Sequence, residues 1–359
     1  MSQAIVPVAK PLLPSAHDIL PYLERMDQAR WYSNGGILVQ ELRRRLAAHF
    51  GVQPGCVRLV GNGTQGLTAA LLASEVRAGA YCVMPAWTFA ASAQAVLAAG
   101  LRPYFIDVEA KAGVITPALV DAALPHVPGE VAAVMPVSPF GAPLDLRIWE
   151  EWRDRSGIPV IVDAAAGFDT CKPSHLPVMV SLHATKIFGV GEGGFLLCDD
   201  PAFQQEVEFR INFGFSGGRE ARSVGMNGKM SEYHAAVGLA QMDRWGETRA
   251  EFIKIAQAWR EALAPLPDIR LQEGWGESWI SATCVIEKGN AVEAARKLAS
   301  HGIETRRWWE RGLHRQPAFT CYSHAVLDVT EKLAERCLGL PFHVDLGRDV
   351  PRQVAALLA

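Results

Sequence analysis

Between Val57 and Cys198, short apolar segments alternate with segments of helical pattern. The apolar segments are VRLVGN, YCVMPA, RPYFIDV, VAAVMPV, IPVIVDA and GGFLLCD, and the helical patterns include TQGLTAALLASEV and TFAASAQAVLAAG. Strands that are apolar throughout and separated by helices are typical of a mostly parallel sheet sandwiched by helices. We therefore expect an α/β fold whose functional residues follow the strands, because such sheets bind ligands at the carboxyl ends of their strands.

The remainder of the chain predicts a smaller second domain. MSEYHAAVGLAQMDRW predicts a helix that closes the large domain, and GETRAEFIKIAQAWREALAPL predicts a long connecting helix. Beyond them, WISATCVIEKG and IETRRWW predict strands, while NAVEAARKLASHG, VTEKLAERCLGL and RDVPRQVAALLA predict helices. Because 359 residues exceed what one core usually holds, we expect a large domain over residues 1–245 and a small C-terminal α+β domain over residues 246–359. The N-terminal segment is expected in the large domain or packed on the small one.

Charge and cysteine content exclude several classes of protein. The formal net charge is −3, so no global positive field attracts nucleic acid or an anionic membrane. The seven cysteines are scattered and never form a CxxC pair, which argues against a disulfide framework or a zinc site and favours a reducing cytoplasm. Residues 1–18 lack the continuous apolar core of a secretory signal, and no stretch is apolar enough for a membrane helix.

A glycine-rich segment, GNGTQG, lies between an apolar strand and an alanine-rich helix. Its glycines allow close backbone approach, Thr64 offers a hydroxyl, and the free N–H groups at the start of the helix attract an anion. A phosphate site is one interpretation. An ordinary turn between strand and helix is the other, because the segment lacks the ending of a P-loop and the spacing of a dinucleotide fingerprint.

Two titratable residues follow later apolar segments. Asp163 ends the strand IPVIVDA, where a buried carboxylate requires a partner. That partner is the pyridine nitrogen in a pyridoxal 5′-phosphate (PLP) enzyme, whereas a lone aspartate is more often a helix cap or half of an ion pair. Lys186, within SLHATKIFGVGEGG, sits among small and apolar residues that lower an amine's pKa and make it nucleophilic, which is atypical of a surface lysine.

These residues belong to a longer series of ordered motifs. The series comprises YSNGGILVQELRRRLAAHFG, VGNGTQGLTAAL, VMPAWTFAASAQAVLAAGLRPYFIDVE, VIVDAAAGF, SLHATKIFGVGEGGFL, VGMNGKMSEYHAAVGLAQMDR, IETRRWW and LGLPFHVDL. Over nearly its whole length the chain resembles the DegT/DnrJ/EryC1/StrS sugar aminotransferases, which are fold type I PLP enzymes. The resemblance implies PLP and its pyridoxamine form as cofactor, and a homodimer whose active sites are shared between subunits.

The resemblance also assigns roles to individual residues. Lys186 is the Schiff-base lysine and proton carrier, and Asp163 is the partner of the ring nitrogen. The implied cofactor-binding residues are Gly63, Thr64, Gln65, Trp87, Phe89, Asp163, Ser181, His183, Lys186 and Asn227. Of the two aromatics, Phe89 matches the ring-stacking position better than Trp87, and core packing is the competing role for either. Asn227 matches an asparagine that reaches the phosphate from a neighbouring subunit.

Three positions depart from the family pattern. Ala166 stands where the family often has a glutamine that contacts the ring hydroxyl of the cofactor, Lys229 replaces a frequent arginine, and Phe213 replaces a histidine. The Schiff-base position retains lysine, which argues against the branch of the family that carries histidine there and dehydrates sugars. The changes bear on substrate preference rather than on the Schiff base.

The resemblance implies transfer of an amino group from an amino acid, by analogy L-glutamate, to a keto-deoxysugar carried on a nucleotide, as in O-antigen synthesis. The expected substrate-binding residues are Tyr32, Ser33, Asn34, Arg306, Trp308 and His314. Arginines suit a diphosphate and tryptophans stack on sugars, although these arginines are equally expected in solvent and the tryptophans in the core. The position of the keto group, C3 or C4, stays open. The alternatives are a PLP aminotransferase acting on a cyclitol or aminobenzoate precursor, and a non-catalytic regulatory protein.

Overall fold

The computed structural model describes residues 5–359, and its centre is a seven-stranded sheet. The strands are β1 Val57–Val60, β2 Tyr81–Pro85, β3 Arg102–Ile106, β4 Val131–Val134, β5 Val162–Asp163, β6 Val178–Ser181 and β7 Gly194–Leu197. Two ladders, β3-β2-β4 and β5-β6-β7-β1, join through the parallel bridges Val134↔Val160 and Val137↔Asp163. In the described residues six of these strands run in one direction and β7 runs opposite to them, so the prediction of a mostly parallel sheet is confirmed.

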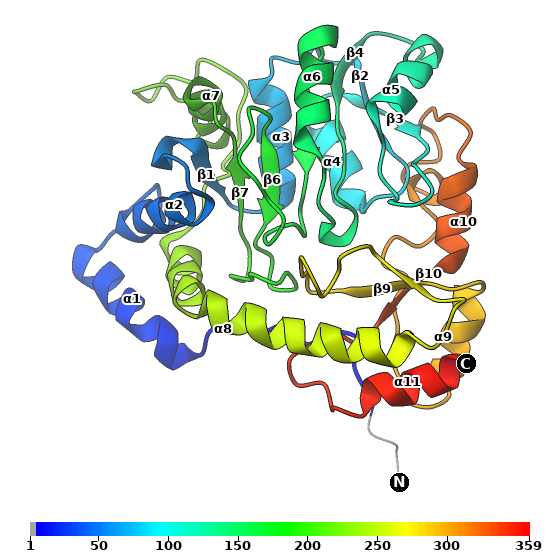
Figure 1. Ribbon diagram of the computed structural model, residues 1–359. Coiled ribbons are helices and arrows are strands. Elements are labelled where there is room, and N and C mark those ends of the chain that lie inside the picture. Colours follow the sequence, from blue (N-terminus) through cyan, green and yellow to red (C-terminus); the bar gives the residue numbers. More distant parts are fainter. Residues whose placement is uncertain (1–4) are drawn as a thin grey trace.

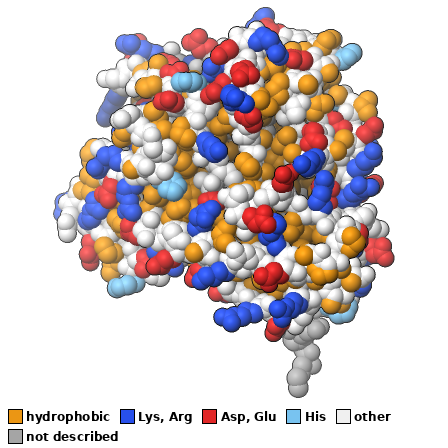
Figure 2. Space-filling view, viewed as in Figure 1, with side chains coloured by type: hydrophobic (Ala, Val, Ile, Leu, Met, Phe, Trp, Pro, Cys, Tyr) orange, Lys and Arg blue, Asp and Glu red, His pale blue; other side chains and the backbone are white. Residues whose placement is uncertain are grey.

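Helices cover the sheet as the alternating pattern predicted (Figure 1). They are α3 Gly63–Ala73, α4 Ala90–Ala98, α5 Pro117–Ala123, α6 Leu146–Ser156 and α7 Pro201–Ile211. The strands β2, β3 and β4 end in buried apolar residues, and β5 ends in the buried Asp163. The strands lack alternating polar residues because both faces of the sheet are covered. Acidic and basic side chains are interspersed on the surface in Figure 2, in keeping with a net charge near zero.

A second, antiparallel sheet lies in the C-terminal part of the chain. It has the order β10-β9-β8 and is accompanied by three helices. Their bounds are β8 Arg270–Leu271, β9 Cys284–Glu287, β10 Cys337–Leu340, α9 Ala291–Ala299, α10 Asp328–Arg336 and α11 Val350–Leu358. The N-terminal segment contacts this unit, since Val6 bridges Ile303 and the N–H of Phe342 donates to the carbonyl of Val8.

Two elements predicted in this C-terminal part are wrong. The segment 303–309 forms isolated bridges and a turn instead of a strand, with Arg306 opposite Gly339. The helix predicted over residues 329–340 ends at Arg336, and the residues that follow form β10. Pairing with β9 decides this, because all four residues of β10 are registered against Cys284–Glu287.

A single helix, α8 Glu232–Leu263, replaces the two helices predicted around Gly246. It packs against α1 Ala16–Ala29, α2 Ile37–Phe50 and α11, and crosses the lower part of Figure 1. Gly246 lies inside the helix with no break, so the domain boundary there stays a prediction. The first four residues of the predicted large domain lie outside the described residues.

A buried carboxylate fastens α8 to α2. Glu232, at the first position of α8, is 0% exposed, and its oxygens accept the N–H groups of Leu38 at 2.7 Å and Val39 at 3.1 Å. The residue that precedes α2, Gly36, has no side chain to cap the helix, so Glu232 satisfies donors that would otherwise be unpaired. A Cβ at Gly36 would lie 2.7 Å from Glu232, which explains the glycine.

We predict that Glu232→Ala lowers the free energy of unfolding by about 2 to 3 kcal/mol, because two N–H groups in the interior lose their acceptor. Urea denaturation of the purified protein measures the change. Glu251→Ala, on the exposed side of the same helix, is the matched control and should leave stability nearly unchanged. Equal effects of the two substitutions would contradict the capping role.

Candidate active site

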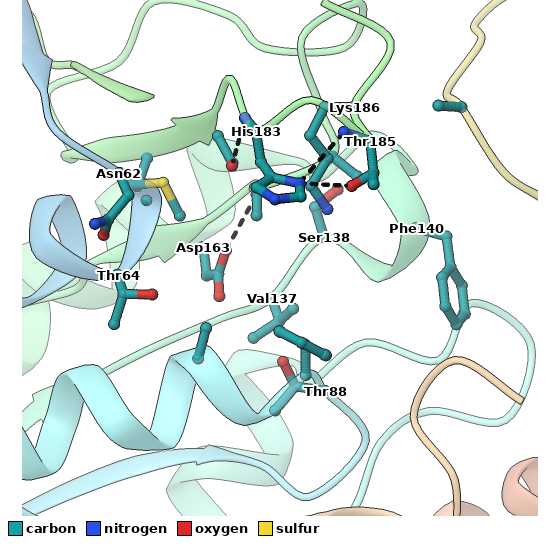
Figure 3. Close-up of a pocket in the computed structure, with 18 of the residues that line it drawn as sticks. Asn62, Thr64, Thr88, Val137, Ser138, Phe140, Asp163, His183, Thr185 and Lys186 are labelled. Atoms are coloured by element: carbon teal, nitrogen blue, oxygen red, sulfur yellow. Dashed lines mark hydrogen bonds between the residues drawn. The ribbon is translucent and has the colours of Figure 1, made fainter. Parts of the chain in front are cut away.

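A cavity of about 640 Å³ opens at the carboxyl ends of the parallel strands. Residues that follow β1, β2, β4, β5 and β6 line it, and Ala282, Thr283, Trp308 and Trp309 close it from the C-terminal part of the chain. Its size is in the range of pockets that hold small molecules and cofactors. Figure 3 shows Asn62 and Thr64 on one side of this cavity, Phe140 on the other, and Asp163 and Lys186 between them. The cavity lies at the sheet edge that the sequence predicted.

Asp163 presents a carboxylate at the end of β5. The residue is 4% exposed, and its Oδ2 accepts the hydroxyl of Ser92 at 2.6 Å while Oδ1 accepts the N–H of Ala165 at 3.1 Å. Burial raises the pKa of Asp163, whereas these two hydrogen bonds and the charge of Lys186 oppose the rise. Each oxygen keeps a lone pair, so the carboxylate can accept a further donor from the cavity.

Lys186 lies on the facing wall, in the turn after β6. Its backbone N–H donates to the carbonyl of His183 at 2.8 Å, which fixes the turn. The residue is half-buried and lines the cavity, so its amine loses part of its contact with water. This desolvation lowers the pKa of Lys186, and the charge of Asp163 only partly offsets it. A larger share of the amine is therefore neutral, and so nucleophilic, at ordinary pH.

The start of α3 forms the anion-binding end of the cavity. The side chain of Asn62 caps the helix by accepting the N–H of Gln65 at 2.9 Å, and this leaves the N–H groups of Gly63 and Thr64 without a partner inside the helix. Ser181 ends β6 beside them, and a Cβ on Gly63 would lie 3.3 Å from that of Ser181. The glycine thus lets the start of α3 pack closely on β6, and the free N–H groups of this helix N-terminus are suited to bind an anion such as phosphate.

Nine of the predicted site residues line this cavity: Gly63, Thr64, Gln65, Phe89, Asp163, Ser181, His183, Lys186 and Trp308. His183 hydrogen-bonds the hydroxyl of Thr185 through Nδ1 at 2.8 Å, and its Nε2 lies 3.6 Å from Glu192. Both neighbours also line the cavity. The structure therefore brings together residues that span more than 240 positions of the sequence.

The two aromatic residues proposed to stack on the cofactor have different surroundings. Phe89 is 60% exposed and lines the cavity. Trp87 is 3% exposed and is absent from the cavity wall, because its ring packs edge-on against Trp309 with centroids 5.1 Å apart. The strand β2 ends at Pro85, so the alternation of a strand no longer places Trp87 and Phe89 on the same side. The assignment of Trp87 to the cofactor is therefore corrected to core packing.

Asn227 is exposed and does not line the cavity of its own chain. Its carbonyl accepts the side-chain amide of Gln65 at 3.2 Å. Tyr32, Ser33 and Asn34 are also exposed, in the loop that precedes α2 and away from the cavity wall. Tyr32 stacks on Tyr233 with ring centroids 6.3 Å apart. Within one chain, these residues are not part of the site.

Of the three C-terminal residues predicted to bind substrate, Arg306, Trp308 and His314, one lines the cavity and two do not. Trp308 lines the cavity, with the guanidinium of Arg306 5.0 Å from its ring, but Arg306 itself points elsewhere and is exposed. His314 is buried and bonded to Glu331 at 2.9 Å, outside the cavity, so its assignment to substrate binding is wrong within this chain. Its position is fixed by the hydrogen bond from Leu313 to the carbonyl of Ala86.

Several lining residues were not predicted. They include Asn62, Thr88, Ser138, Phe140, Glu192 and Thr283. Phe140 has the most unusual backbone of these residues, since its φ of +55° is rare for an aromatic residue. Its ring stacks on that of Trp309, with centroids 4.0 Å apart. A glycine follows it, because a Cβ at Gly141 would lie 2.5 Å from the carbonyl of Ala166.

Comparisons with known proteins agree on the class. A solved structure of a putative PLP-dependent aminotransferase from Bacillus cereus superposes with a TM-score of 0.92 at 29% identity and covers 99% of each chain. A structure of DesI in the presence of its TDP-sugar product gives a TM-score of 0.88 at 29% identity, covering 100% of this chain and 93% of that one. The fold is that of the PLP-dependent aminotransferases.

The chain belongs to the DegT/DnrJ/EryC1/StrS aminotransferase family, whose model matches residues 15–359. This confirms the resemblance seen in the sequence. The dTDP-4-amino-4,6-dideoxy-D-glucose transaminase of Shigella dysenteriae is 28% identical, over 98% of this chain and 97% of its own. In the part of the chain that the structure describes, no helix has the length and apolar character to cross a membrane.

We predict that Lys186→Met stabilises the cofactor-free protein, and does so more at about pH 6 than at about pH 9.5. The pKa of Lys186 is lowered from 10.5, so burying its charged form destabilises the fold at low pH, and this penalty fades as pH rises toward the unfolded-state value. Thermal melting of both proteins at the two pH values measures the difference. Lys172→Met, at an exposed lysine, is the control, and a gain independent of pH would contradict the expected linkage.

Proposed function

We propose that this protein is a PLP-dependent aminotransferase acting on a nucleotide-linked keto-deoxysugar. The observation that carries the proposal is a nucleophilic lysine and a buried carboxylate facing one cavity, with a helix N-terminus at its far end. The residues fit PLP: Lys186 would hold its aldehyde carbon, Asp163 its ring nitrogen, and the start of α3 with Ser181 its phosphate. Phe89 would cover a face of the ring.

PLP, when bound, supplies an aldehyde that condenses with amines and a protonated ring that withdraws electrons from the substrate carbon. Lys186 then acts as the proton carrier. Its Nζ takes the α-proton of the amino donor in one half of the reaction and delivers a proton to the sugar carbon in the other. A lowered pKa suits both tasks near neutral pH. Asp163 keeps a negative charge at the ring nitrogen, while the apolar walls limit water at the reacting atoms.

The substrate class rests on the relatives and on the cavity wall. The Shigella relative is named for a dTDP-4-amino sugar, and the structure of DesI was determined in the presence of its TDP-sugar product. We infer the same substrate class here and, from the name of the Shigella relative, amination at C4. Trp308 and Phe140 offer flat apolar surfaces to a deoxysugar. L-glutamate is the proposed amino donor, on the family resemblance.

We further propose a homodimer with shared sites. Among the described residues, Lys186 is the one Lys or Arg side chain on the cavity wall, yet the cofactor phosphate, the donor carboxylates and a diphosphate all carry negative charge. A second subunit can supply the missing donors. The exposed aromatic rings support this, because aromatic side chains are enriched at protein interfaces. Tyr32 and Tyr233 stack on each other at the surface, and Phe89 and Phe213 are exposed elsewhere in the chain. Asn227, exposed in its own chain, is the residue we place at the partner's phosphate.

The function is tested with purified protein loaded with PLP. L-glutamate should convert the visible absorption of the bound cofactor to near-ultraviolet absorption, and dTDP-4-keto-6-deoxyglucose should restore it with formation of an amino sugar detected by mass spectrometry. Lys186→Ala should abolish turnover, whereas Lys172→Ala should retain it. Conversion by glutamate without any product from nucleotide sugars would overturn the substrate class, and the absence of both would overturn the enzyme.

The shared site is tested by mixing two impaired variants. Lys186→Ala and Asn227→Ala homodimers should each have at most a few per cent of wild-type activity, since each lacks one half of every site. After subunit exchange, each heterodimer holds one intact site, so activity should recover toward about a quarter of wild type, following the statistics of mixing. No recovery, with exchange verified by native mass spectrometry, would place Asn227 outside the partner's site.

A further inference from the structure

A chain of buried hydroxyl groups ends on the carboxylate of Asp163. Ser92, in the first turn of α4, is 0% exposed, and its Oγ lies 2.6 Å from Asp163 Oδ2. Thr88, just before that helix, is 1% exposed, and its Oγ1 lies 2.8 Å from the Oγ of Ser92. Thr88 lines the cavity and is labelled below Asp163 in Figure 3.

The protons of this chain can be assigned from its chemistry. A serine hydroxyl has one proton, and the ionised carboxylate can only accept, so Ser92 donates to Asp163. The hydroxyl of Ser92 then has only lone pairs left for Thr88, and Thr88 must donate to it. Both hydroxyl protons therefore point toward the carboxylate. The two hydrogen bonds, from Thr88 to Ser92 and from Ser92 to Asp163, polarise each other and stabilise a negative charge on Asp163.

The surroundings of Ser92 are apolar. Seven of the nine residues of α4 are alanine, valine or leucine, and Ser92 lies fully buried in its first turn. A buried hydroxyl is unfavourable unless it is hydrogen-bonded, and its partner is Asp163, the one buried carboxylate that the described residues place on the cavity wall. The second donor to that carboxylate, the N–H of Ala165, binds the other oxygen, so the two donors fix its plane.

We propose that Ser92 is a positioning residue that orients Asp163 and holds it ionised for the ring nitrogen of PLP, with Thr88 as its own support. This rests on the proposed function, since it concerns how the chain prepares its carboxylate for the cofactor. Ser92 does not line the cavity and touches no substrate, so its effect reaches the cofactor only through Asp163.

The experiment measures the affinity of cofactor-free protein for PLP and for 1-deaza-PLP, in which a carbon replaces the ring nitrogen. Ser92→Ala should weaken PLP binding by about 10- to 100-fold, the effect of losing a hydrogen bond to a charged group. The same variant should bind 1-deaza-PLP as the wild type does, because that compound has no ring N–H for Asp163 to meet. Ser74→Ala, which removes a hydroxyl bonded only to Ala70, is the matched control.

Thr88→Val tests the far end of the chain and guards against misfolding of the Ser92 variant. It should lower PLP affinity in the same direction but less, again without affecting 1-deaza-PLP. Equal losses for both compounds would show a merely structural role and overturn the proposal, as would an unchanged affinity for PLP in both variants. Failure of the wild type to bind PLP is a different outcome, since it would overturn the proposed function itself.

Discussion

The active site depends on an acid and an amine, Asp163 and Lys186, that are desolvated together on the wall of one cavity. Burial raises the pKa of Asp163 and lowers that of Lys186, so each group is shifted toward its neutral form. The charge of each group opposes the pKa shift of the other and so favours the charged form of its partner. Such an arrangement destabilises the fold. It persists because the carboxylate accepts hydrogen bonds from Ser92 and Ala165, and because an amine with a lowered pKa is what carbonyl chemistry requires.

The sheet explains how one chain brings these groups together. Five strands, β1, β2, β4, β5 and β6, end at the same edge, so residues from five separate loops reach one cavity. The long helix α8 and its cap at Glu232 hold the N-terminal helices to this framework, and the C-terminal part adds Trp308 and Trp309 as the last wall. In the function we propose, the single chain supplies the groups around the ring of the cofactor, and a second subunit supplies further anion-binding groups.

Much of this was predictable from local sequence, and the exceptions have physical causes. Asp163 and Lys186 were predicted because an acid at the end of an apolar strand and a lysine among glycines are locally unusual. Ser92 gave no signal, because its partner is 71 positions away. Trp87 and His314 were misplaced because packing on Trp309 and bonding to Glu331 decide where they lie. The helix predicted through Leu340 ends early because pairing with β9 outweighs local helix propensity.

The most direct test of Lys186 as the Schiff-base lysine is to load the protein with PLP, reduce it with borohydride and map the modified lysine by peptide mass spectrometry. We expect stable attachment at Lys186, with little at exposed lysines such as Lys172. We also expect Asp163→Asn protein, at the same PLP concentration, to be labelled less at this position because the ring nitrogen has lost its charged partner. Labelling at another lysine, or none in the wild type, would contradict the assignment of this cavity to the cofactor.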